Sequence, residues 1–139
     1  IFTSILYHLY NDINAQSEKY QPEIKQSSRS PKLTKPDNVA EIARNTGLPE
    51  YRTRRIKNHL FYREHQLDDR VSRFDPDPDI ADAWERLRRG EYIAEDLALL
   101  EHEYFESRFE GIFRTDYRTA HEATIRSGRI WNPPSPPLA

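Results

Sequence analysis

The chain has 139 residues, of which 36% are hydrophobic and 32% charged, and its formal net charge at pH 7 is −2. That length suffices for one domain around one core, and the modest hydrophobic fraction predicts a lean core under a largely ionic surface. The absence of cysteine excludes disulfide bonds, thiolate zinc sites and cysteine nucleophiles. No stretch reaches the roughly 18 apolar residues of a transmembrane helix, and no signal-peptide pattern is found at the start. Because methionine is also absent, we expect the chain to begin inside a longer product, through processing or trimming.

Composition and periodicity divide the chain into four segments. Apolar residues recur at helical spacing at the start, which predicts an N-terminal helix over residues 1–14. Residues 15–35 are rich in Gln, Ser, Lys and Pro, which is typical of a loop or linker. Residues 36–131 are expected to form the helical core, and the proline-rich residues 132–139 an extended tail.

Helix start and stop signals are clear in the first part of the expected core. Thr34 and Asp37 fit a capping box for a helix that ends at Gly47. Pro49 is suited to the first turn of the next helix, which is expected to run to about Gln66. These signals predict two helices joined by a short turn.

The prolines that follow residue 73 mark the start of another helix. The run Phe74-Asp-Pro-Asp-Pro-Asp cannot lie inside a helix, because each proline disfavours helix in the residue before it. Asp77 is a natural N-cap with Pro78 at the first position, and Gly90 is a natural end.

Two further helices are expected near the C-terminus. One covers about residues 94–110 and is ended by Gly111, and the other covers about residues 116–127 with Thr115 as its cap. Their short connection predicts an antiparallel helical hairpin. The sequence therefore predicts an all-α fold: one compact helical domain of about six helices with a C-terminal αα-hairpin and a Pro-rich tail.

The charges are unevenly distributed along this core. Residues 41–73 carry eight Lys or Arg against five acids, a net charge of +3, whereas residues 74–110 carry twelve acids against four arginines, a net charge of −8. One face is therefore suited to phosphate, and another to a metal ion or a basic partner. Solvated helix faces of mixed sign are the alternative interpretation.

The most concentrated set of ionisable residues comprises His102, Glu103, Glu106 and His121. His102 and Glu106 are four residues apart and share one helix face, and the expected hairpin brings His121 opposite them. The spacing is similar to the zincin motif His-Glu-x-x-His, but Glu106 stands where a zincin has its second histidine, so a metallopeptidase is not expected. The set predicts a catalytic site, through general acid–base chemistry or through a divalent metal with His102, Glu106 and His121 as candidate ligands. A structural ion-pair network is the alternative.

A second set of polar residues lies on the expected helix that begins at Pro49. Basic residues alternate there with Tyr, Asn and His, a pattern that suits contacts with phosphate and bases. An amphipathic helix with charged outer positions would show the same pattern. The residues expected to contact nucleic acid are Arg52, Arg54, Arg55, Lys57, His59, Arg63 and His65.

Residues 39–60 also fit the spacing of a helix-turn-helix. Ala43, Gly47 and Ile56 occupy its small, turn and apolar positions. Because many helical corners share this pattern, a DNA-binding module without catalysis stays open as an alternative.

An ordered series of motifs in residues 38–131 resembles the C-terminal toxin domains of bacterial polymorphic toxins, including Rhs-repeat and contact-dependent types. The motifs are Ile-Ala-Arg-Asn-Thr-Gly-Leu (42–48), Ile-Lys-Asn-His-Leu-Phe-x-x-Glu-His (56–65), Arg-Phe-Asp-Pro-Asp-Pro-x-Ile-Ala-x-Ala-Trp-x-Arg-Leu (73–87), Leu-x-His-Glu-x-x-Glu (100–106) and Ala-His-Glu (120–122).

The resemblance implies a secreted antibacterial effector. Such domains are released from a parent shell or delivery protein, act in the cytoplasm of a target cell, and are neutralised in the producer by a cognate immunity protein. Many are nucleases, while others modify proteins or nucleotides. The leading hypothesis is therefore a toxin nuclease acting on RNA or DNA, with a protein- or nucleotide-modifying toxin enzyme as the alternative.

Overall fold

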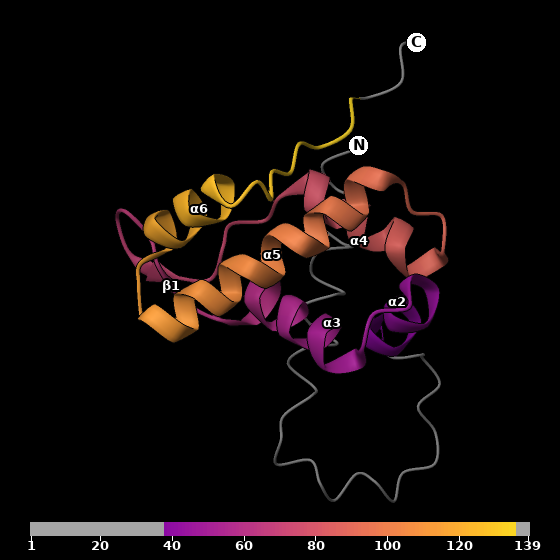
Figure 1. The fold of residues 1–139 in the computed structure, drawn as a ribbon, viewed down its shortest axis with the longest axis horizontal. Helices are drawn as coiled ribbons and strands as arrows, with labels where there is room; N and C mark the ends of the chain where they lie inside the picture. Colours follow the sequence, from indigo (N-terminus) through magenta and orange to yellow (C-terminus); the bar gives the residue numbers. More distant parts are fainter. Residues whose placement is uncertain (1–37, 136–139) are drawn as a thin grey trace, which may run out of the picture.

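The computed structural model describes residues 38–135, which form one helical unit (Figure 1). The all-α prediction is confirmed, because two very short strands are the sole non-helical elements of this part of the chain. The predicted N-terminal helix, the linker, the Thr34/Asp37 capping box and residues 136–139 of the tail lie outside the described residues. The elements are α2 (Asn38–Thr46), α3 (Glu50–Lys57), the π-helix η2 (Asn58–Tyr62), β1 (His65–Gln66), β2 (Val71–Ser72), α4 (Pro78–Arg89), α5 (Ala94–Phe113) and α6 (Tyr117–Arg126).

Several helix ends lie where the capping residues predicted them. The Asp77 carboxylate accepts hydrogen bonds from the backbone N–H groups of Asp79 at 2.8 Å and Ile80 at 3.3 Å, with Pro78 in the first turn of α4. Gly90 ends α4 with a φ of 76°, a left-handed conformation that glycine adopts without strain. None of the described helices is long and apolar enough to cross a bilayer.

The prediction of one helix from Pro49 to Gln66 is wrong in its last third. At Asn58 the α-helix widens into the π-turn η2, which closes with a 2.8 Å hydrogen bond from the Arg63 N–H to the Asn58 carbonyl. His65 then belongs to β1, which pairs with β2 in an antiparallel register that sets His65 opposite Ser72. Because a π-turn holds more residues than an α-turn, His59, Leu60 and Phe61 are all buried in succession.

The C-terminal hairpin is confirmed, with corrections at its turn. α5 continues through Gly111 to Phe113, and its C-cap Arg114 has a φ of 52°. The N-cap of α6 is Asp116 and not Thr115, because the Asp116 carboxylate accepts the backbone N–H of Thr119 at 2.8 Å. α6 packs along one side of α5 and α3 along the other, so α5 is the central helix (Figure 1).

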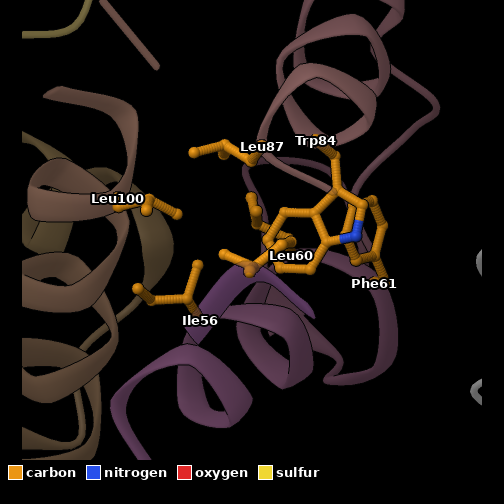
Figure 2. Close-up of a cluster of buried hydrophobic side chains, with 7 residues drawn as sticks. Ile56, Leu60, Phe61, Trp84, Leu87 and Leu100 are labelled. Atoms are coloured by element: carbon orange, nitrogen blue, oxygen red, sulfur yellow. The ribbon is translucent and has the colours of Figure 1, made fainter. Parts of the chain in front are cut away.

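A small apolar core joins α2, α3, η2, α4 and α5. Figure 2 shows Trp84 of α4 against Phe61 of η2, and their ring centroids lie 5.2 Å apart in an edge-on arrangement. Tyr51 of α3 and Leu97 of α5 lie outside this core, with exposed fractions of 67% and 39%. The buried members of the core are Ile42, Ile56, Leu60, Phe61, Trp84, Leu87 and Leu100.

Two sets of polar side-chain contacts link the helices of the bundle to one another. The Asn45 side-chain amide donates to the carbonyls of Leu87 and Arg88, each at 2.9 Å, which ties α2 to the last turn of α4. The Arg86 guanidinium forms a bidentate pair with Asp96 at 2.8 Å for both bonds, and this pair ties α4 to the first turn of α5. The lean core is thus supplemented by directional contacts.

We expect Trp84→Ala to lower the free energy of unfolding by about 3–5 kcal/mol, because it leaves a cavity in the middle of the core. Denaturant unfolding followed by circular dichroism measures the loss. Ile112→Ala, at a position 59% exposed, is the control and should change stability by less than about 0.5 kcal/mol. Equal effects of the two substitutions would contradict this description of the core.

Candidate functional site

The inner face of α5 beyond the apolar core is ionisable. Glu103, Glu106 and Glu110 follow one another at helical spacing along this face, with His102 beside them. His102, Glu103 and Glu106 are 4%, 6% and 1% exposed, because η2 and β1 cover them from one side and α6 from the other. Buried carboxylates require partners. Every ion-pair partner of Glu103, Glu106 and Glu110 within residues 38–135 is a histidine.

Glu106 lies at the centre of the site and contacts three histidines from three segments. Its Oε1 lies 2.8 Å from Nε2 of His59 on η2. Its Oε2 lies 3.2 Å from Nε2 of His102 and 3.0 Å from Nδ1 of His121 on α6. The structure thus brings His102, Glu106 and His121 together across the hairpin, as the sequence predicted, with Glu103 one turn away.

His59 and His65 belong to the same site. They were expected to contact nucleic acid, but they are 2% and 1% exposed, and their rings lie 4.6 Å apart. The His65 Nδ1 lies 2.6 Å from Oε1 of Glu110, and its Nε2 donates to the His59 carbonyl at 2.8 Å. We call these seven residues the histidine–glutamate cluster: His59, His65, His102, Glu103, Glu106, Glu110 and His121.

The electrostatics of the cluster depend on burial and on the histidines. Burial, together with the adjacent Glu106, raises the pKa of Glu103 well above its usual range. Burial also disfavours the charge on Glu106, but hydrogen bonds from His102, His121 and His59 outweigh it and hold the pKa of Glu106 well below its usual range. The hydrogen bond to Glu106 raises the pKa of His121. The fold therefore stabilises Glu106 as a carboxylate.

Two aromatic residues that sequence reasoning missed enclose the cluster. Phe74 stacks on His65 with ring centroids 3.9 Å apart, and Tyr117 meets Phe74 edge-on at 5.0 Å. The Tyr117 hydroxyl lies 3.4 Å from Nδ1 of His121, one helical turn along α6. Glu110 was also missed, although its position one turn beyond Glu106 was a signal for it. These rings limit the orientations that the histidines can adopt.

A basic cavity of about 250 Å³ lies next to the cluster. Arg55 is fixed at its wall by hydrogen bonds to the Ser107 hydroxyl at 2.8 Å and to the Ser107 carbonyl at 3.2 Å. His59 lines this cavity and also contacts Glu106, so the cavity and the cluster share a residue. We call it the arginine cavity; its lining residues are Tyr51, Arg54, Arg55, Asn58, His59, Arg63 and Ser107.

The other residues expected to contact nucleic acid lie outside this cavity. The Arg52 guanidinium lies 4.4 Å from the centroid of the Tyr104 ring and 3.9 Å from a carboxylate oxygen of Glu101. Lys57 is buried, with 7% exposure. Of the basic residues singled out in the sequence, the arginine cavity thus gathers Arg54, Arg55 and Arg63.

The helical corner of α2 and α3 agrees with the helix-turn-helix spacing at three positions. Gly47 has a φ of 78°, and Ala43 and Ile56 are 8% and 0% exposed. These contacts explain the spacing as packing of one helix on another. Reading of DNA bases by this corner stays a prediction.

We expect Glu106→Gln to destabilise the chelator-treated protein by about 3–5 kcal/mol, because it removes the charge that the buried His59 and His102 and the partly exposed His121 contact. Glu101→Gln, on the same helix with a side chain 53% exposed, should cost less than about 1 kcal/mol. Urea unfolding of both variants measures the difference. Indistinguishable midpoints would show that Glu106 is not the centre of the cluster.

Comparisons of this chain with protein-family models, with curated proteins and with solved structures found no significant match. The function is therefore inferred from the chemistry of the histidine–glutamate cluster and the arginine cavity.

Proposed function

We propose that this chain is a phosphodiester hydrolase of the nuclease type that acts on RNA or DNA. The histidine–glutamate cluster is its catalytic centre, and the arginine cavity is its phosphate site. The single observation that carries the proposal is the position of His59, which lines the cavity and contacts the central carboxylate of the cluster at 2.8 Å. A phosphate held in the cavity would lie next to the catalytic groups.

The cavity has the chemistry that a phosphate requires. Arg54, Arg55 and Arg63 all line it, and guanidinium groups bind phosphate oxygens through paired, charge-assisted hydrogen bonds. Arg55 is held in place by Ser107, which reduces the conformational freedom that it would lose on binding. The arginine cavity has a volume of about 250 Å³, which is sufficient for a phosphate group but too small for a nucleic-acid strand. A strand would have to lie along the rim of the cavity.

Hydrolysis needs a nucleophilic water and a positive environment for the developing charge. The water oxygen bonds to phosphorus as the bond from phosphorus to the leaving oxygen breaks; the water gives up a proton, and the leaving oxygen gains one. His102, Glu106 and His121 place three ligand atoms within 4.8 Å of one another, which fits a divalent ion. Such an ion would lower the pKa of a bound water and neutralise phosphate charge.

The motif resemblance supports a toxin role for this chemistry. The segments that resemble polymorphic toxin domains contain every residue of the cluster except Glu110, and they also contain Phe74. We therefore propose a secreted effector that is released from a parent delivery protein, acts in the target-cell cytoplasm and is neutralised by a cognate immunity protein. The resemblance and the cluster thus involve the same residues.

His121→Ala should abolish degradation of RNA or DNA by the purified chain and its toxicity on expression in bacteria, because it removes the partly exposed member of the group formed by His102, Glu106 and His121. Its thermal transition, followed by circular dichroism, should remain cooperative. His102→Ala should have the same effect on activity. Full cleavage by either folded variant would overturn the catalytic assignment, whereas a specific DNA footprint without cleavage would favour the helix-turn-helix module.

Arg63→Ala should raise KM for nucleic acid about tenfold, equivalent to one charge-assisted hydrogen bond, with a smaller effect on kcat. The salt dependence of binding should also become shallower. Arg89→Ala is the matched control. It makes the same change in charge at an exposed position on α4 and should leave KM and the salt dependence unchanged.

If the wild-type chain hydrolyses nucleotides but not polymers, the substrate is a nucleotide.

A further inference from the structure

We infer that the cluster binds two divalent cations that share Glu106 as a bridging carboxylate. The first site comprises Nε2 of His102, Oε2 of Glu106 and Nδ1 of His121. The second comprises Nε2 of His59, Oε1 of Glu106 and a carboxylate oxygen of Glu103. Metal binding stands on this geometry alone, whereas a catalytic use of the two ions rests on the proposed function.

The distances between ligand atoms suit coordination. In the first site, Glu106 Oε2 lies 3.2 and 3.0 Å from the two histidine nitrogens. In the second, the His59 nitrogen lies 2.8 Å from Glu106 Oε1 and 3.4 Å from Glu103 Oε2. Neighbouring ligands of an ion bound at about 2.0–2.2 Å lie about 2.8–3.6 Å apart in octahedral or tetrahedral geometry. Each site needs only small shifts and keeps a position open for water or substrate.

The two oxygens of Glu106 are directed to different sites. Oε1 contacts His59 on the η2 side, and Oε2 contacts His102 and His121 on the α6 side. A carboxylate that offers one oxygen to each of two ligand sets is the arrangement of a bridging ligand. Two ions bridged in this way would be compatible with the separation of about 3.5–4 Å at which two-metal centres act on phosphodiesters.

The charge balance of the cluster favours cations. Three carboxylates are concentrated on one face of α5, and within the described part of the chain no Lys or Arg forms an ion pair with them. Oε2 of Glu103 and Oε2 of Glu110 are buried without a hydrogen-bond partner among the described residues. Such oxygens are costly to bury unless a cation or a proton reaches them. Two divalent ions would favour the ionised forms of Glu103 and Glu106, the two carboxylates of the proposed sites.

The orientation of His102 supports a metal ligand. Its Nδ1 donates to the Arg129 carbonyl at 2.7 Å, which orients the ring with its Nε2 3.2 Å from Oε2 of Glu106. A ligating histidine whose other ring nitrogen donates to a backbone carbonyl is the usual arrangement around protein metal sites.

A third possible ligand set, formed by His59, His65 and Glu110, is not assigned an ion. The His65 Nδ1 and Glu110 Oε1 lie 2.6 Å apart, a direct hydrogen bond that is too short to enclose an ion between them. The other nitrogen of His65 donates to the His59 carbonyl. His65 and Glu110 are therefore positioning residues that support His59.

The test is metal stoichiometry by isothermal titration calorimetry with Zn²⁺ on the untagged, chelator-treated chain, confirmed by elemental analysis. Two ions should bind per folded wild-type chain. His121→Ala and the isosteric Glu103→Gln should each bind one, because each removes a ligand of a different site, whereas the control Glu101→Gln should bind two. Glu106→Gln should weaken both sites at least about 100-fold, since even outer-shell changes cost 10–100-fold. With Mn²⁺, the wild-type EPR spectrum should show a spin-coupled pair that both single-site variants lose.

One ion or none on the folded wild-type chain would overturn the inference, as would two ions on both His121→Ala and Glu103→Gln. The wild-type stoichiometry decides the matter even if a variant fails to fold. The failure of the proposed function has a different signature. Two bound ions without cleavage of RNA or DNA would refute the nuclease and leave the metal pair. Cleavage in excess chelator would leave the nuclease and refute a catalytic use of the ions.

Discussion

The site depends on one buried carboxylate. Glu106 is 1% exposed and contacts His59, His102 and His121, which come from η2, α5 and α6. An ionised group in that position is tolerated only because all three histidines direct a ring nitrogen at it. The three segments must therefore dock together, and the polar cluster contributes to the tertiary structure as well as to chemistry.

The two halves of α5 have different roles, core packing in the first half and the ionisable site in the second. The first half of the helix contacts the apolar core through Leu100 and is braced by the Arg86–Asp96 pair. The second half carries the carboxylates between η2 and α6. Because a rigid bundle holds one half of the helix, the other half presents its ligands at fixed spacing, which is the preorganisation that a catalytic or metal site requires.

The local departures from regular structure lie at the site. The π-turn of η2 buries His59, and the short hairpin of β1 and β2 brings His65 back toward Glu110. The same turn borders the arginine cavity, so one irregular segment links a basic surface to an acidic interior. The proposal of phosphate chemistry rests on this linkage.

The sequence by itself determined the helical class, most helix ends and the pairing of His102 and Glu106 with His121, because caps, prolines and 3.6-residue spacing act over a few residues. It placed His59 and His65 on an outer basic helix, because the π-turn that breaks that helix has no local signature. The gathering of the two histidine pairs around Glu106, and the placement of Glu110, Phe74 and Tyr117 beside them, were decided by the tertiary structure. These contacts join residues up to 47 positions apart, and only the packing of η2 and α6 on opposite sides of α5 brings them within hydrogen-bonding distance.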